Sequence, residues 1–223
     1  MYDKAKIKEN IERIYKAING RATVLAATKT VPSEIINYAA DCGIKVIGEN
    51  RVNELLEKYE HLDRDGLEMH FIGHLQRNKV KYIIDKVSLI QSVDSIRLAK
   101  EIDRLAYKAD KCMDVLIEVN VADEPTKYGI RYEEIDDFIE KISNFENIRL
   151  RGLMSIPPKS ENSHENNVFF NKLNKKFIDI SAKKVDNSNI DILSMGMSGD
   201  YISAVENGST LVRIGSAIFG ERV

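Results

Sequence analysis

Residues 22–50 read "ATVLAATKTVPSEIINYAADCGIKVIGEN", and the order of patterns within this stretch decides the fold. An apolar run over 22–29 is typical of a strand, and a helix-like segment over 31–43 follows it, with Pro32 near its start and Gly43 at its end. A second apolar run covers 44–50. This order is typical of a unit with two parallel strands, because a parallel connection needs about a dozen residues.

The same alternation continues along the chain. Apolar runs rich in Val, Ile and Leu recur at 22–29, 44–50, 67–74, 87–93, 113–120, 148–155, 190–196 and 210–219. Near-continuous apolar strands are typical of parallel sheets that are covered on both faces. Eight such strands with seven intervening helix-like segments predict an α/β protein with one domain over 1–223, a (β/α)8 barrel of the TIM type.

An open, doubly wound parallel sheet is the main alternative. Against it, no G-x-G-x-x-G pattern follows the first strand, where a dinucleotide-binding fold would place one. A charged amphipathic helix is expected over 1–20, and the chain ends soon after the eighth apolar run. We therefore expect the N-terminal helix to fill the gap in the outer ring of helices.

The composition argues against several classes of partner. The formal net charge is −2, so no basic surplus indicates nucleic acid or an anionic membrane surface. No apolar run approaches the ~20 residues that a membrane-spanning helix needs, and the charged N-terminus does not have the pattern of a secretory signal. Cys42 and Cys112 have no metal-ligand spacing, so we expect reduced thiols, a cytoplasmic protein and no metal site.

Polar residues follow the apolar part of nearly every expected strand. In a barrel of this type the carboxyl ends of the strands form one mouth, and the active site is built there. Each of these residues alone could simply mark the point at which a strand meets water. Together they predict a polar pocket, with candidate side chains at Lys29, Glu49, Asn50, His74, Gln91, Ser92, Asn120, Ser155, Ser194 and Arg213.

A histidine pair lies on the third expected strand. His70 and His74 would share one face, but no third metal ligand lies near them in the sequence. A zinc site needs at least three protein ligands, so we expect core or pocket-wall roles for both residues.

The loops after the last two strands carry glycine and serine. The segment "SMGMSGD" at 194–200 follows the seventh strand, and "RIGS" at 213–216 lies towards the end of the eighth. Small residues let the backbone approach an anion, and the Ser198 hydroxyl and free N–H groups can donate to it. Because these two loops form the usual phosphate site of such a barrel, the pattern favours a phosphorylated ligand.

Lys29 ends the first expected strand and would share the mouth with this phosphate site. A lysine shielded from water can attack an aldehyde as a free amine. A phosphate and a reactive aldehyde in one ligand indicate pyridoxal 5′-phosphate, which proteins hold through a lysine Schiff base. The residues alone leave a second chemistry open, a cofactor-free aldolase whose lysine attacks a sugar-phosphate carbonyl.

Several motifs resemble those of a known family. The segments "ATKT", "GENRVNE", "HFIGHLQRNK", "VNVADEPTKYG", "LRGLMSIPP", "LSMGMSGDY" and "LVRIGSAIFGER" occur in this order between about residues 22 and 222. They are similar to the motif series of the pyridoxal phosphate homeostasis protein family, which resembles the barrel domain of alanine racemase without the second, β domain of that enzyme. The resemblance implies a fold-type III barrel that binds pyridoxal 5′-phosphate.

The resemblance also implies roles for single residues. Lys29 would form the Schiff base, and Arg213 would face the pyridine nitrogen. Ser198, the backbone of 197–199 and Gly215 would hold the phosphate, and Ser194 and Met195 would lie at the lip of that site. The cofactor-binding residues implied in this way are Lys29, Asn50, Ser194, Met195, Ser198, Arg213 and Gly215.

A racemase of this fold needs a second acid or base opposite the lysine, and the resemblance implies that the missing domain would supply it as a tyrosine. A site with one base cannot efficiently invert a stereocentre by proton transfer on both faces. We therefore expect a non-catalytic monomer that binds pyridoxal phosphate, contributes to vitamin B6 homeostasis and can pass the cofactor to apoenzymes. The alternative is a small monomeric amino-acid racemase that depends on pyridoxal phosphate.

Overall fold

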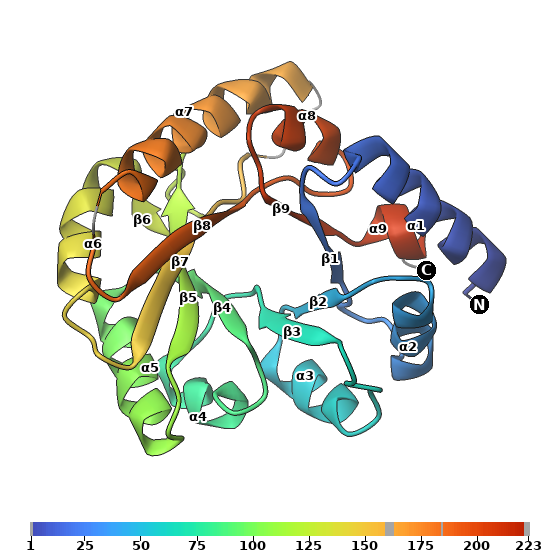
Figure 1. Cartoon of the computed structure of the whole chain (residues 1–223), viewed down its shortest axis with the longest axis horizontal. Helices are drawn as coiled ribbons and strands as arrows, with labels where there is room; N and C mark the ends of the chain where they lie inside the picture. The colour runs from blue at the N-terminus through green and yellow to red at the C-terminus, as the bar shows by residue number, and fades with distance from the viewer. Residues whose placement is uncertain (1, 159–162, 184, 221–223) are drawn as a thin grey trace.

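The eight expected strands are present and close into a barrel (Figure 1). The computed structural model describes residues 2–158, 163–183 and 185–220. The barrel strands are β1 (Thr23–Ala27), β2 (Val46–Glu49), β3 (Glu68–Phe71), β4 (Leu89–Val93), β5 (Met113–Asn120), β7 (Ile148–Met154), β8 (Ser188–Ser194) and β9 (Leu211–Ile214). Neighbouring strands are parallel, and the pairings of β4 with β5 and of β9 with β1 complete the ring. The predicted (β/α)8 barrel is confirmed, and the open sheet is wrong.

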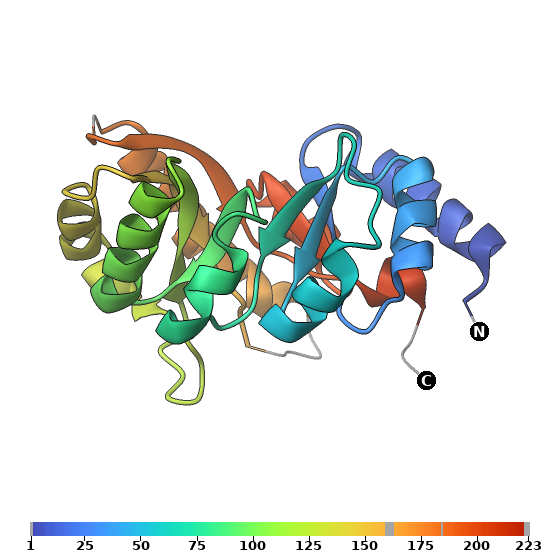
Figure 2. The same ribbon diagram turned by 90° about the horizontal axis from the view of Figure 1, so that it is seen from below.

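One short strand was not expected from the sequence. β6 (Ile130–Arg131) pairs with the end of β5, where Val119 lies opposite Ile130. Figure 2 shows the loop between β5 and β6 projecting beyond the ends of the barrel strands. Two residues are too few to show a strand pattern, so this element depends on its partner strand.

The helices form the outer layer around the barrel (Figures 1 and 2). They are α1 (Lys4–Ile18), α2 (Ser33–Asp41), α3 (Val52–Tyr59), α4 (Val80–Ile83), α5 (Ile96–Lys108), α6 (Ile135–Ile142), α7 (Ser163–Ser181), α8 (Tyr201–Glu206) and α9 (Ser216–Phe219), with 3-10 turns at Arg77–Lys79 and Tyr132–Glu134. Asp3 and Ser95 cap α1 and α5 by accepting a backbone hydrogen bond in the first turn. None of the described helices is long and apolar enough to cross a membrane.

The first helix occupies its expected place in the ring. Figure 1 shows α1 between α8 and α2, beside α9. Its inner face buries Ile7, Ile11, Ile14 and Ile18. The Asn10 side-chain amide donates to the Ile218 carbonyl at 3.0 Å and so connects α1 to α9. The prediction that the N-terminal helix fills the gap is confirmed.

The last strand is shorter than the apolar run over 210–219 predicts. β9 ends at Ile214, and α9 begins at Ser216. The Gly215 carbonyl accepts hydrogen bonds from the N–H groups of Ile218 and Phe219, at 2.9 and 3.0 Å, and these bonds close the first helical turn. A short apolar run has no period that separates strand from helix, so the sequence could not place this boundary.

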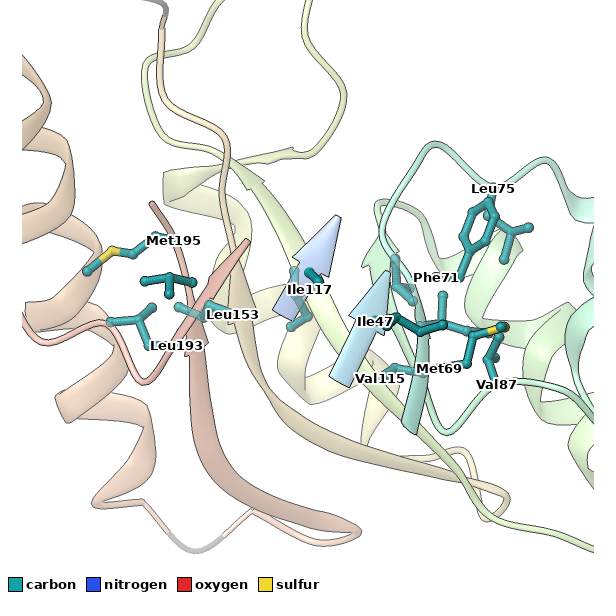
Figure 3. Packing of buried hydrophobic residues seen from close by; sticks show 14 of the residues in the cluster. Ile47, Met69, Phe71, Leu75, Val87, Val115, Ile117, Leu153, Leu193 and Met195 are labelled. Atoms are coloured by element: carbon teal, nitrogen blue, oxygen red, sulfur yellow. The ribbon is translucent and has the colours of Figure 1, made fainter. Parts of the chain in front are cut away.

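Side chains alternate between two hydrophobic layers along the strands. The larger layer lies between the barrel and the helices, and Figure 3 shows part of it, including Ile47, Phe71, Val115, Leu153 and Met195. Smaller clusters of residues within the strands or directly after them fill the interior of the barrel, with Leu25, Val46, Ile72, Leu89, Leu116, Met154 and Leu211. Toward the carboxyl ends of β8 and β9, the polar side chains of Ser194 and Arg213 occupy interior positions. At the barrel mouth, polar side chains therefore lie next to apolar side chains of the barrel interior.

Candidate functional site

A pocket of about 560 Å³ opens at the carboxyl ends of the strands. Five of the seven expected site residues line it, namely Lys29, Asn50, Ser198, Arg213 and Gly215. Lys29 and Asn50 follow β1 and β2, Arg213 lies on β9, and the other two lie in the loops after β8 and β9. The barrel thus brings together residues that are up to 186 positions apart (Lys29 to Gly215).

The rest of the pocket wall is apolar or small. It consists of Ala27, Ile72, Ile156, Met197, Gly199 and Ser216. An apolar wall with a few convergent polar groups is typical of a site for a small organic ligand. The polar groups of this pocket include two cationic side chains, Lys29 and Arg213, so the ligand that fits it carries negative charge.

At one end of the pocket, backbone donors hold the Ser198 hydroxyl. The N–H groups of Gly215 and Ala217 both point at Ser198 Oγ, at 3.2 and 3.1 Å. Gly196 gives the preceding loop its shape, because its φ is +91° and a Cβ there would lie 2.4 Å from the Cβ of Ala204. The Met197 N–H donates to the Asp200 carboxylate at 2.6 Å, which braces the same loop. This end of the pocket can bind an anion.

Arg213 is a buried cation on the pocket wall. Its side chain donates to Ser194 Oγ at 2.5 Å and to the Ser155 carbonyl at 2.9 Å. Burial lowers the pKa of the Arg213 guanidinium to about 10, and the negative charges of Glu118 and Asp200 oppose that shift. The guanidinium therefore remains charged at neutral pH, held by neutral partners.

Asn50 reaches the pocket because the chain after β3 passes very close to it. A Cβ on Gly73 would lie 2.1 Å from the Asn50 carbonyl oxygen, so only glycine allows this approach. The loops after β2 and β3 are packed backbone to backbone at this point, which fixes the place of Asn50.

The comparisons with known proteins agree with this geometry. The model of the alanine racemase N-terminal domain matches residues 2–223. A pyridoxal phosphate homeostasis protein of Aquifex aeolicus (strain VF5) is 46% identical over 223 residues, which cover 97% of each chain. The chain belongs to the pyridoxal phosphate homeostasis protein family.

Solved structures place this member of the pyridoxal phosphate homeostasis protein family among similar barrels. PipY of Synechococcus elongatus PCC7942, solved with PLP bound, has a TM-score of 0.87 and 27% identity, and the match covers 96% of this chain and 100% of PipY. An alanine racemase of Clostridium difficile 630 in complex with cycloserine has a TM-score of 0.73 at 14% identity, and the match covers 98% of this chain and 60% of the racemase. The racemase shares the barrel fold.

Two residues that the family resemblance placed at the lip of the phosphate site, Ser194 and Met195, do not line the pocket. The side chain of Met195 is fully buried between the barrel and the helices, where Figure 3 shows it beside Leu193. The side chain of Ser194 lies inside the barrel, where it accepts from Arg213 and donates to Gln91. Successive strand residues point to opposite faces, so these neighbours could not both line the pocket. Ser194 accepts a hydrogen bond from Arg213 inside the barrel, and Met195 packs in the hydrophobic core.

Helix α3 holds the backbone on both sides of Lys29, which the sequence did not reveal. The Lys58 ammonium donates to the Thr28 carbonyl at 2.8 Å, and the Glu54 carboxylate accepts from the Thr30 N–H at 2.9 Å. Thr30 has a φ of +64°, an uncommon value for a β-branched residue. The spacing of Glu54 and Lys58, four residues apart on one helix face, was the available signal.

Other expected strand-end residues have structural roles. Glu49 points out of the barrel and pairs with Lys58 at 2.7 Å. His74 stacks on Tyr128 with a centroid distance of 3.8 Å, and Asn120 donates to the Glu124 carbonyl at 2.8 Å. Among the residues that the structure describes, no group of three or more His, Cys, Asp and Glu side chains is placed to hold a metal ion.

Glu118 is a buried carboxyl group that sequence reasoning missed. It lies on β5, its side-chain Oε2 has no hydrogen-bond partner within the described residues, and the residue is 8% exposed. Burial, reinforced by Asp94 and opposed by Arg213, raises the pKa of Glu118 to about 7. In the sequence it stands within a continuous apolar strand, and that position was the only sign of its burial.

Proposed function

We propose that this protein binds pyridoxal 5′-phosphate reversibly in the pocket at the barrel mouth and contributes to vitamin B6 homeostasis without catalysing a reaction. The observation that carries the proposal is the convergence of the Lys29 amine, the Arg213 guanidinium and the Ser198 hydroxyl on one pocket. The PLP-bound structure of the related PipY supports the same ligand.

The residues present fit this cofactor. Its phosphate needs hydrogen-bond donors. The Ser198 oxygen already accepts from the N–H groups of Gly215 and Ala217, so the Ser198 hydroxyl proton is left to donate to the phosphate. Its ring needs an apolar wall, which Ile72 and Ile156 can supply. Lys29 is the lysine among the described pocket-lining residues, so it is the amine that would react with the aldehyde.

Each residue of the pocket would have a defined task. When bound, pyridoxal phosphate supplies an aldehyde that a lysine amine can hold as a Schiff base. Arg213 has only hydrogen-bond donors, so facing the pyridine nitrogen it would favour the unprotonated ring. Thr28 and Thr30, held by α3, would keep the Lys29 backbone in place while the ligand exchanges.

The composition of the pocket supports a role without catalysis. Racemisation needs an acid or base on each face of the reacting carbon. Of the described residues that line the pocket, the titratable side chains are Lys29 and Arg213, and a guanidinium with a pKa of about 10 is a poor proton donor at neutral pH.

We further propose that the protein acts as a monomer in the cytoplasm and passes the cofactor to apoenzymes that need it. Its two free thiols, Cys42 and Cys112, suit that compartment.

The test is an absorbance titration of the purified protein with pyridoxal 5′-phosphate, beside Lys29→Ala. The exposed Lys45 precedes the first residue of β2 and so lies at the opposite end of that strand from the mouth, which makes Lys45→Ala the matched control. We expect a visible Schiff-base band in the wild type and the control but not in Lys29→Ala. Borohydride reduction followed by peptide mapping should place the modification on Lys29.

The same samples test the absence of catalysis. Amino acids incubated with the loaded protein should keep their chirality over the time in which an alanine racemase equilibrates them. Inversion that is lost in Lys29→Ala would show a racemase instead. A band that persists in Lys29→Ala, with label scattered over surface lysines, would contradict the proposed site.

A further inference from the structure

A line of polar side chains crosses the interior of the barrel from the pocket toward the opposite end. Arg213 Nη1 donates to Ser194 Oγ at 2.5 Å, and the Ser194 hydroxyl donates to Gln91 Oε1 at 2.7 Å. Gln91 Nε2 lies 3.0 Å from His70 Nδ1, and His70 Nε2 faces Glu68 Oε2 at 3.5 Å. We call these five residues the interior relay.

The hydrogen bonds of the interior relay all have the same direction. A guanidinium can only donate, so Ser194 Oγ must accept from Arg213, and its single proton points to the Gln91 oxygen. The Gln91 amide nitrogen is then left to donate to His70 Nδ1, which places the imidazole proton on Nε2, toward the Glu68 carboxylate. The arginine at one end thus determines the proton position on the histidine near the other.

Burial opposes any reversal of the donor-to-acceptor direction in these hydrogen bonds. Ser194 and Gln91 are fully buried, and Arg213 and His70 are each 4% exposed. A buried polar group without a partner loses its hydrogen bonds to water and gains none in return, so reversal at one member of the relay is opposed by the next. The far end is different: the Glu68 side chain is 65% exposed, and its interaction with His70 lowers the pKa of the Glu68 carboxyl. The relay therefore connects a buried cation to an exposed carboxylate.

Arg213 depends on such neutral partners for its orientation. Among the described residues, none forms an ion pair with it, and its side chain is held by the Ser194 hydroxyl and the Ser155 carbonyl. The Ser155 carbonyl is fixed by the backbone, because the Ser155 N–H donates to the Ser194 carbonyl at 3.1 Å. The Ser194 hydroxyl can rotate, and Gln91 is the acceptor that stops it.

We propose that Gln91 and His70 are positioning residues for Arg213, which act through the Ser194 hydroxyl and decide how the guanidinium faces the pocket. The proposal rests on the proposed function, because Arg213 acquires its role toward the pyridine nitrogen there. Neither Gln91 nor His70 lines the pocket. Their effect on cofactor binding is therefore transmitted through the barrel interior.

The first test uses the protein without cofactor, so it stands even if pyridoxal phosphate does not bind. In ¹⁵N NMR spectra of the wild type, His70 should carry its proton on Nε2, and Arg213 should give separate Nη signals because both ends of its guanidinium are held. Gln91→Leu should merge or broaden the Arg213 signals. His61→Gln, a change at an exposed histidine on the surface, is the matched control and should leave them unchanged.

The second test measures the dissociation constant for pyridoxal 5′-phosphate. Loss of one buried hydrogen bond to the relay should weaken binding roughly fivefold to tenfold in Gln91→Leu and His70→Leu. His70→Gln keeps an amide oxygen that can accept from Gln91, so it should restore affinity to within about twofold of wild type. A role in packing alone would not separate His70→Leu from His70→Gln.

The outcomes are distinct. A proton on His70 Nδ1 in the wild type would overturn the proposal even if no variant folds. Wild-type Arg213 signals and affinity in both Gln91→Leu and His70→Leu would also overturn it. If wild type fails to bind pyridoxal phosphate while the Arg213 signals change as expected, the proposed function is wrong and the positioning of Arg213 stands.

Discussion

The ammonium of Lys58, a residue of α3, lies 2.7 Å from Glu49 Oε1 at the end of β2. Their side chains are 12% and 1% exposed, so this is a buried ion pair. The Lys58 ammonium also donates a hydrogen bond to the Thr28 carbonyl, one residue before Lys29. The motif "GENRVNE" at 48–54 therefore contributes its two glutamates to the support of the pocket as well as Asn50 to its wall.

We expect Lys58→Met to lower the free energy of unfolding by about 3 kcal/mol, because it leaves the Glu49 carboxylate buried without its cation. Urea denaturation at pH 7 measures this change. The double variant Lys58→Met/Glu49→Leu should recover most of the loss, since it removes both charges. A loss in the double variant as large as in the single one would contradict the ion-pair explanation.

Glu118→Gln should stabilise the protein above neutral pH. The pKa of Glu118 rises from 4.5 to about 7 on folding, so the unfolded chain binds fewer protons between these values. Stability therefore falls as pH rises from about 4.5 to about 7, and the cost remains at higher pH. This difference corresponds to about 3 kcal/mol. Denaturation midpoints should show a gain for Glu118→Gln at pH 8 and almost none at pH 4, and an equal gain at both would contradict it.

Gly196→Ala should destabilise the protein by about 2 kcal/mol and weaken cofactor binding, because a Cβ would lie 2.4 Å from the Cβ of Ala204 at a φ of +91°. Gly66→Ala is the matched control. Its φ is +66°, but nothing lies within 4 Å of the added Cβ. Thermal unfolding and a pyridoxal phosphate titration measure the two effects. If Gly196→Ala and Gly66→Ala weakened cofactor binding equally, the loss could not be assigned to the loop before Ser198.

Asn10→Ala should lower the free energy of unfolding by about 1–2 kcal/mol, because the buried Ile218 carbonyl loses a donor from α1. Asn53→Ala, at an exposed position of α3, is the control. It gains the same helix propensity as Asn10→Ala but loses no buried hydrogen bond, so it should not destabilise the protein. Denaturant titration of the two variants gives the comparison. A similar stability for both would mean that the contact between α1 and α9 contributes little.

The sequence predicted the positions of the strands well, because parallel strands with both faces covered are almost continuously apolar. It predicted the place of Lys29, Asn50, Ser198, Arg213 and Gly215 at one mouth, because strand ends in a barrel must meet there. Its errors were local. The run over 210–219 contains both a strand and a helix, and β6 is too short to have a pattern.

The chain by itself determined the barrel, the outer place of α1 and the family, since these follow from the period of apolar residues and from ordered motifs. Only the tertiary structure decided which side chains meet. Met195 packs outward, Ser194 and Gln91 meet in the interior 103 positions apart, and Lys58 reaches behind Lys29. The reason is that each strand residue must face one side of the sheet, and which distant residue it meets there depends on the register of the closed ring.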